Sequence, residues 1–221
     1  MKPAYTFILL FAGLFAFAQS YTLDYVLDIE YQARENETPT KGTWYINSKD
    51  NTYLLEFRTK NEGITDVHFF DALKVVGLDS YAKHKINIDK GELTMDCSKV
   101  LYFKNPYKKN HLKRYYFEVL NDTVIDGKAY IHYAFKCNDK KYAKRKKIGE
   151  IHYIVHKDGP DVKPVLLYKT APLTVYMMHR NIPNGLLKER YFVTHDGKTE
   201  YRYKVTGYSE TKFMLTAKPC Y

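Results

Sequence analysis

The sequence contains none of the short motifs that mark common enzyme classes. It has no Gly-x-Ser-x-Gly nucleophile turn, no glycine-rich phosphate loop and no His-Glu-x-x-His metal motif. Acidic residues are scattered over the polar faces of strand-like runs, without a spacing that favours acid–base catalysis. We therefore predict a protein that is not an enzyme, with no catalytic residue, no cofactor and no bound metal.

Cysteine is also scarce, with only Cys97, Cys137 and Cys220 in the chain. Their spacing does not match a zinc site. In an oxidising compartment a Cys97–Cys137 disulfide is our first expectation, because both residues end strand-like runs. Three unpaired thiols remain the alternative, since spacing alone does not establish a disulfide.

Long apolar runs are absent except at the N-terminus. Lys2 precedes an apolar stretch from Thr6 to Phe17, and Ala16-Phe17-Ala18 has the small-x-small pattern of a cleavage site. The stretch is shorter than the roughly 20 residues that a membrane-spanning helix needs. We interpret residues 1–18 as a signal peptide, with an uncleaved anchor as the alternative. The protein is then expected to be exported, to the periplasm or the cell exterior.

Positive charge is in excess, with a formal net charge of +10. Much of this excess falls in residues 104–114 and 140–147. Such segments can contact an anionic membrane or an acidic polymer surface. More often, a basic run is a solvated turn that keeps a sheet edge from pairing. Because no nucleic-acid-reading motif is present, we do not expect a nucleic acid partner.

What the chain has in abundance is alternation of apolar and polar residues, the pattern of strands buried on one face. Residues 21–31 and 201–205 alternate in this way. Residues 127–157 read as a long antiparallel hairpin around a basic connection, with Tyr133 and Phe135 on its apolar face. Further strands are predicted at 43–47, 53–59, 64–70, 74–78, 86–88, 92–95, 116–120, 186–194, 201–208 and 213–217.

Helix is correspondingly scarce, and Leu173–Arg180 is the best candidate for one. Phe103–Arg114 is expected to be an exposed loop. Many short antiparallel strands joined by turns imply a strongly curved sheet. We predict an all-β fold with minor helix, in which residues 19–221 form a single antiparallel β domain shaped as a half-open or closed barrel.

Aromatic residues are frequent, with 22 Tyr and 12 Phe. The tyrosines recur on the inward faces of the predicted strands, where a buried hydroxyl needs a partner. Such an interior suits an amphipathic ligand, although Tyr is also simply a good strand former. The residues predicted to contact a hydrophobic ligand such as a lipid or acyl chain are Tyr25, Leu27, Tyr53, Phe57, Tyr133, Phe135, Tyr153 and Tyr203.

The same hairpin carries His132 and His152 on its more polar face. If they lie across from each other, then with Glu150 nearby they could bind a metal or titrate near neutral pH. The alternative, which we favour, is that they are two surface histidines.

The segment 182–187 (IPNGLL), followed by Lys188-Glu189 and a hairpin over Asp196-Gly197, resembles the Pro-x-Gly-(Leu/Ile) segment of the exported GLPGLI-type proteins of Bacteroidetes and their outer-membrane lipoprotein-carrier-like relatives. Residues 149–167 are similar to the strand, turn and Pro-Leu run that precedes that segment. Asn184 departs from the family pattern. The resemblance implies a half-open curved sheet with helical lid segments that shelters lipid or acyl chains.

Taken together, these features predict an exported, non-enzymatic protein that binds a hydrophobic or amphipathic ligand inside a curved sheet. The alternative is a structural or interaction module of the cell envelope that uses the basic loops.

Overall fold

The computed structural model describes residues 19–61, 64–72, 75–82, 90–102, 112–166 and 171–217. The predicted signal peptide, the predicted strand 86–88, most of the predicted loop 103–114 and Cys220 lie outside these residues.

The described strands form one sheet of 13 strands. Its main path runs β7-β5-β4-β3-β2-β1-β13-β12-β11-β10-β8, while β6 pairs with β13 and β9 with β10. The strand bounds are β1 Gln19–Arg34, β2 Thr40–Ile46, β3 Tyr53–Asn61, β4 Ile64–Asp71, β5 Val75–Ala82, β6 Glu92–Met95, β7 Val100–Tyr102, β8 Tyr115–Val119, β9 Thr123–Ile125, β10 Lys128–Cys137, β11 Glu150–His156, β12 Leu187–Val193 and β13 Thr199–Ala217.

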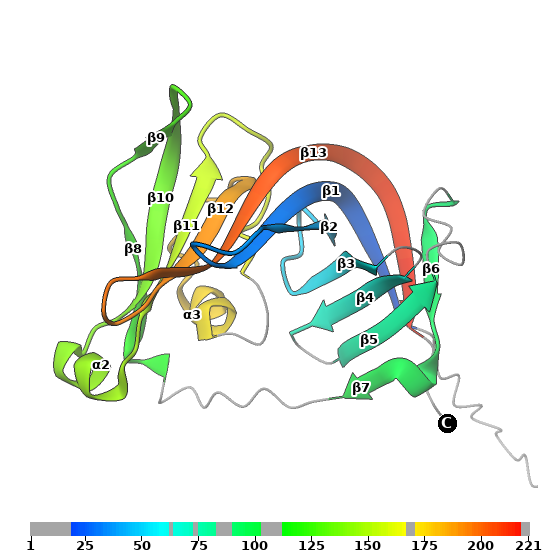
Figure 1. Ribbon diagram of the computed structural model, residues 1–221, viewed down its shortest axis with the longest axis horizontal. Coiled ribbons are helices and arrows are strands. Elements are labelled where there is room, and N and C mark those ends of the chain that lie inside the picture. The colour runs from blue at the N-terminus through cyan, green and yellow to red at the C-terminus, as the bar shows by residue number, and fades with distance from the viewer. Residues whose placement is uncertain are drawn as a thin grey trace, which may run out of the picture.

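Neighbouring strands run antiparallel except β6, which runs parallel to β13. The path ends at β7 and β8 without closing by hydrogen bonds. The predicted curved antiparallel sheet is thus confirmed, in its half-open form. In Figure 1, β1 and β13 form an arch, with α3 (Ala171–His179) beneath one side and β3 to β5 beneath the other.

The arch depends on β13, which the sequence divided into two strands at 201–208 and 213–217. The structure shows one strand of 19 residues instead. Its register with β1 shifts between Leu23 and Tyr25 and again between Asp28 and Ile29, so β13 carries extra residues at both places. Such bulges bend a strand without ending it, which explains why no turn is needed.

Two buried clusters lie on opposite faces of β2 to β4. Trp44, Leu54 and Phe70 belong to the cluster that also contains α3, which we call the lid core. Tyr45 and Leu55, on the other face, belong to a cluster whose described members all lie on strands, which we call the strand core; it is made of Tyr21, Leu23, Tyr45, Leu55, Phe57, Val67, Phe69, Met95, Phe213, Leu215 and Ala217.

The predicted helix over 173–180 is confirmed by α3. The basic connection of the hairpin holds a helix that was not predicted, α2 (Lys140–Lys146). Its start is fixed by Asp139, whose carboxylate accepts a hydrogen bond from the Tyr142 N–H at 2.8 Å. The short 3-10 helix η3 covers Cys97–Lys99.

The predicted Cys97–Cys137 disulfide is not formed, because Cys137 is a free thiol. Sheet topology gives the reason. Cys137 ends β10, near one end of the strand order, whereas Cys97 begins η3, just before β7 at the other end.

Candidate ligand-binding site

The lid core is covered by α3 and by the segments on either side of it. Before α3, Asn51 donates a hydrogen bond to the Pro164 carbonyl at 2.8 Å, and Lys163 N–H donates to the Ser48 carbonyl at 2.9 Å. The helix itself contributes apolar side chains to the core, namely Leu173, Val175 and Tyr176. The flanking segment is therefore tied to the sheet by directional bonds, while α3 packs on it through its apolar surface.

Apart from Thr174 and His179, α3 consists of apolar residues, which is typical of a helix with most of its surface buried. Met177 and Met178 nevertheless stay 47% and 38% exposed. Methionine is flexible and adapts to irregular apolar surfaces. The outer side of the lid thus offers an apolar contact that no other part of the described chain covers.

A narrow pocket marks the seam between lid and sheet. Ile46, Leu54 and Phe70 line it from the sheet and Leu173 from α3, and its full lining is Ile46, Asn47, Asn51, Thr52, Tyr53, Leu54, Phe70, Lys163, Val165, Leu166 and Leu173. Its cavity volume of about 20 Å³ holds about one water molecule. This seam is therefore packed in this state, and a larger ligand can enter here only if α3 moves.

A larger hollow of about 390 Å³ lies elsewhere, at the ends of β1, β6 and β13. Asp24, Lys90, Glu92 and Lys212 contribute charges of both signs to its lining. This mixture selects no particular ligand, so we place the candidate site in the lid core.

Within the lid core, one row of side chains crosses five neighbouring strands. The register pairs Tyr133 with Tyr153, Tyr153 with Arg190, Arg190 with Tyr203, and Tyr203 with Tyr31. Because paired residues share a face of the sheet, the five side chains form a continuous line. We call this line the Tyr–Arg row.

One end of the Tyr–Arg row is dry. Tyr133 is fully buried, stacked on Tyr153 with ring centroids 5.1 Å apart, and its hydroxyl has no hydrogen-bond partner among the described residues. Burial raises the pKa of Tyr133 well above its usual range, and Tyr153 and Tyr176 add to the rise. An unpaired buried hydroxyl is unfavourable by about 1–3 kcal/mol, so this atom is one that a ligand or water would satisfy.

The other end is partly exposed and positively charged. The Arg190 guanidinium lies 5.5 Å from the ring centre of Tyr203, and the Arg58 guanidinium lies 5.5 Å from that of Tyr31. Arg58 is neutralised by the buried Glu56, at 2.8 Å. Arg190 forms no ion pair with any described carboxylate, and its Nε is buried without a hydrogen-bond partner.

Arg190 also acts on its neighbours in the row. Burial raises the pKa of Tyr153, and the charge and hydrogen bonding of Arg190 oppose that rise. Burial raises the pKa of Tyr203 in the same way, with Arg190 and then Arg58 opposing it. Arg190 therefore lies among buried tyrosine rings without an ion pair to a described carboxylate.

The structure brings together six of the eight residues predicted to bind a ligand. Tyr25, Leu27, Tyr133, Phe135, Tyr153 and Tyr203 all pack in or against the lid core. Phe57 lies in the strand core. Tyr53 packs against the strand core and also lines the pocket at the seam. Their role in ligand binding stays a prediction.

Arg190 was missed by sequence reasoning. It lies in a predicted strand, but its importance depends on the register of four other strands. One signal was available in the sequence. Arg190 is a cation at an inward position of the strand, and the adjacent carboxylate, Glu189, points to the opposite face and so cannot pair with it.

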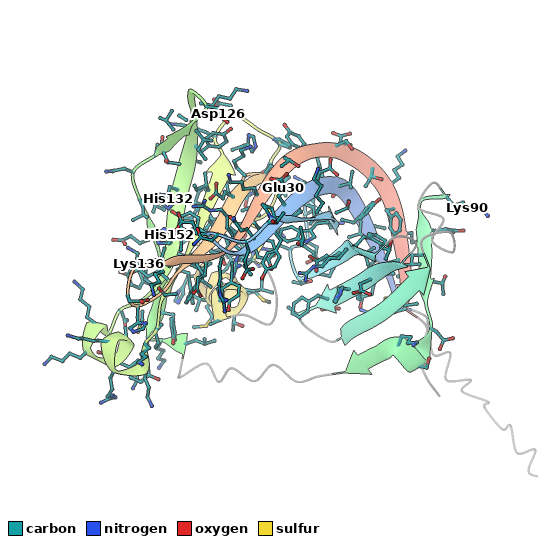
Figure 2. All side chains as sticks on the ribbon, viewed as in Figure 1. Glu30, Lys90, Asp126, His132, Lys136 and His152 are labelled. Atoms are coloured by element: carbon teal, nitrogen blue, oxygen red, sulfur yellow. The ribbon has the colours of Figure 1, made fainter. Side chains whose placement is uncertain are left out.

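The two histidines are in contact on the outer face of the hairpin, although we favoured the interpretation that they are two separate surface histidines. His132 Nε2 and His152 Nδ1 are 2.9 Å apart, although the register places the residues diagonally and not opposite each other. Glu150 lies 3.5 Å from His152, and Tyr191 stacks on His152 with centroids 4.9 Å apart. Figure 2 shows His132, His152 and Lys136 close together at the hairpin.

The described residues contain neither a metal-binding cluster nor a helix suited to cross a membrane. No cluster of three or more His, Cys, Asp or Glu side chains is arranged to hold a metal ion in this part of the chain. No described helix is both long and apolar enough to cross a bilayer.

Comparison with known proteins gives no family assignment. No protein-family model and no curated protein matches the chain, so the resemblance to the GLPGLI-type proteins stays a prediction. Among solved structures, the chain is similar to a chain of the Pseudomonas aeruginosa MucA/MucB complex, with 8% identity and a TM-score of 0.44 over 88% of this chain and 53% of that one.

Two further structures show weaker similarity. One is a putative outer membrane lipoprotein-sorting protein domain from Vibrio parahaemolyticus, with 9% identity and a TM-score of 0.31 over 85% of both chains. The other is a LolA superfamily protein from Nitrosomonas europaea, with 9% identity and a TM-score of 0.30 over 80% of this chain and 66% of that one. The chain spans about half the length of the MucB structures that it matches. At these scores none of them bears on what this chain binds.

Proposed function

We propose that this protein is a non-enzymatic binding protein for a hydrophobic or amphipathic ligand, a lipid or acyl chain, held between the sheet and α3. The observation that carries the proposal is the Tyr133 hydroxyl, which is fully buried beneath α3 and has no described partner. A core optimised only for stability would place Phe there, because the unpaired hydroxyl is unfavourable.

The way α3 is held supports a lid that opens. Its contribution to the lid core consists of apolar side chains, and apolar contacts are non-directional and roughly proportional to buried area. When α3 lifts, the sheet loses the apolar contacts of Leu173 and Val175. An acyl chain that takes their place against the sheet buries much of the same apolar area again. The exposed Met177 and Met178 then give the displaced helix, or the incoming chain, a first apolar contact.

The single tryptophan provides a direct test. Trp44 is fully buried in the lid core, and its indole N–H donates to Glu56 at 2.9 Å. We would titrate the protein with a brominated fatty acid, because bromine quenches indole fluorescence only at close range. Saturable quenching that unbrominated oleic acid reverses is expected. Absence of quenching, together with no lipid in solvent extracts of the purified protein, would reject the proposal.

A control variant moves the reporter to the other core. Tyr45 is adjacent in sequence but faces the strand core, and it is 6% exposed. In the variant Trp44→Phe/Tyr45→Trp the indole therefore lies on the opposite side of β2. Quenching should disappear although binding persists, which a competition assay with a fluorescent fatty acid would verify. Equal quenching in both proteins would indicate non-specific association.

A second candidate function rests on α2. This helix has no buried residue and carries five Lys or Arg side chains, with Lys147 as its C-cap. Arg114 lies 4.4 Å from the ring centre of Tyr142 and so joins a further cation to this surface. The surface suits an anionic membrane or polymer. Sedimentation with phosphatidylglycerol vesicles should be salt-sensitive and lost in Lys144→Glu/Lys146→Glu; unchanged sedimentation would exclude this role.

A further inference from the structure

We infer that the ligand is an anionic amphiphile whose carboxylate or phosphate group binds Arg190, while its apolar chain lies along the lid core beneath α3. This inference rests on the proposed function and narrows its ligand class. It starts from the Tyr–Arg row, which joins the buried end at Tyr133 to Arg190, the charged and partly exposed residue in the middle of the row.

The first argument is charge. Arg58 has Glu56 at 2.8 Å and Arg202 has Glu189 at 2.9 Å. Arg190, on the inner face of the same sheet, has no described carboxylate partner. Arg190 hydrogen-bonds Tyr153 and lies over the ring of Tyr203, but a partly buried cation without an anionic partner is unfavourable unless something neutralises it. A ligand carboxylate or phosphate would do so with charge-assisted hydrogen bonds from the planar guanidinium.

The second argument is geometry. Cross-strand pairing places Arg190 between Tyr153 and Tyr203, which are 1% and 7% exposed. The aromatic rings surround the guanidinium with low-dielectric walls, so its attraction for an anion is weaker than in vacuum but stronger than in water. Its Nε is buried and unpaired, which leaves a donor aimed into the protein and not into solvent.

The third argument is the position of the apolar part. From Arg190, the row continues through Tyr153 to Tyr133, two strands away, or roughly 10 Å at the usual strand spacing. Phe117 and Tyr176 flank that end, within the lid core. An acyl chain anchored at Arg190 would therefore enter the region that α3 covers, and a polar group further along it could accept a hydrogen bond from the Tyr133 hydroxyl.

The test measures competition against a bound fluorescent fatty acid by three ligands with matched chains. These are oleic acid, which carries a carboxylate, oleoyl lysophosphatidic acid, which carries a phosphate, and oleyl alcohol, which is neutral. In Arg190→Gln we expect affinity for the preferred acid to fall by about 10-fold or more, the range for a lost charge-assisted bond. Affinity for oleyl alcohol should change less than about two-fold.

Three comparisons make the outcome decisive. Arg34→Gln, at an arginine whose side chain is 77% exposed, should leave all three affinities unchanged. Arg190→Lys should recover part of the lost affinity, because it restores the charge without the planar fork. Whichever of carboxylate and phosphate binds more tightly to the wild-type protein identifies the head group.

The inference is overturned if Arg190→Gln weakens acid and alcohol equally, since that would indicate a structural role through Tyr203, or if it weakens neither. The proposed function fails in a different way, because then none of the three ligands would bind the wild-type protein.

Discussion

The lid core and the strand core are built from the same kinds of side chains but are closed in different ways. Among the described residues, the strand core is bounded by β1, β6 and β13, which hydrogen-bond to one another through the sheet. The lid core is sealed by α3, which brings Leu173, Val175 and Tyr176. Breaking a ladder exposes backbone groups, whereas lifting a helix keeps its own hydrogen bonds intact. Of the two cores, the lid core is therefore the one that we propose can open.

The two cores also differ in whether their buried polar atoms have hydrogen-bond partners. In the strand core, the buried Tyr21 hydroxyl donates to Asp71 at 2.9 Å. In the lid core, the Tyr133 hydroxyl and the Arg190 Nε are buried and unpaired. Buried polar groups are normally satisfied, so these unpaired atoms support the proposal that the lid core is the one that binds a ligand.

The largest expected effect separates the two cores by stability. Phe213→Ala in the strand core should lower the free energy of unfolding by about 3–5 kcal/mol, as for other buried Phe side chains. Leu173→Ala in α3 should cost less than the roughly 2–5 kcal/mol of a rigid core, because undocking of the lid limits the loss. Urea unfolding measures both, and hydrogen exchange over 171–179 should report the open lid.

That comparison fails if Leu173→Ala costs as much as Phe213→Ala, or if amides of α3 exchange as slowly as those of β1 and β13. Either result would mean that the helix is a fixed part of the core and not a lid.

A matched pair of smaller changes removes one hydroxyl from each core. Tyr21→Phe breaks a buried hydrogen bond to a carboxylate and should destabilise the protein by about 1–3 kcal/mol. Tyr133→Phe removes an unpaired hydroxyl, so it should leave stability unchanged or raise it by up to about 1 kcal/mol. Thermal and urea unfolding of the ligand-free protein measure both. A loss in Tyr133→Phe equal to that in Tyr21→Phe would show that the hydroxyl has a partner.

The architecture could be predicted because one-sided strands leave a clear alternation in the sequence. The inward positions of Leu27, Tyr133 and Tyr153 followed directly from that pattern. The continuous β13 could not be predicted, because bulges opposite Tyr25 and Ile29 replace the turn that the residues suggested. The division into two cores could not be predicted either. β2 buries the adjacent residues Trp44 and Tyr45 on its two faces, and alternation does not tell which element covers each face.

The candidate site was less predictable than the fold. Arg190 becomes a site residue only through its alignment with Tyr153 and Tyr203, which is a matter of register between strands. The lid role of α3 depends on where the helix packs, and its short apolar sequence does not specify this. Unpaired atoms such as Tyr133 Oη are properties of the packed structure and leave no sequence signal.

A smaller effect concerns the exposed side of the lid. Met177→Ser/Met178→Ser should leave the free energy of unfolding within about 0.5 kcal/mol, as is usual at exposed positions. If these side chains make the first contact with an apolar ligand, association with fatty acid should slow several-fold in stopped-flow quenching of Trp44. Val124→Ser, at a residue that is 68% exposed on β9, is the control and should not change the rate. Equal rates in all three proteins would remove the methionines from the entry path.

The smallest expected effect lies on the outer face of the strands that hold Tyr133 and Tyr153. Burial, followed by the charge of Lys136, lowers the pKa of His132. Burial and then His132 lower the pKa of His152, while Glu150 opposes this change. Lys136 is held there by Glu118 at 2.7 Å, and Tyr191 covers His152 from β12.

Both shifts act on stability in the same direction. Below the unfolded pKa of about 6.5, the unfolded chain takes up protons that the folded chain does not, so stability falls as pH falls. His132→Gln/His152→Gln should therefore reduce the slope of stability between pH 7.5 and 5.5, measured by urea unfolding. His156, whose pKa is also lowered by burial, should leave a residual slope. Tyr133→Phe, on the inner face of the same strand, should keep the full slope. If the double variant also keeps the full slope, then groups other than His132 and His152 cause the loss of stability at low pH.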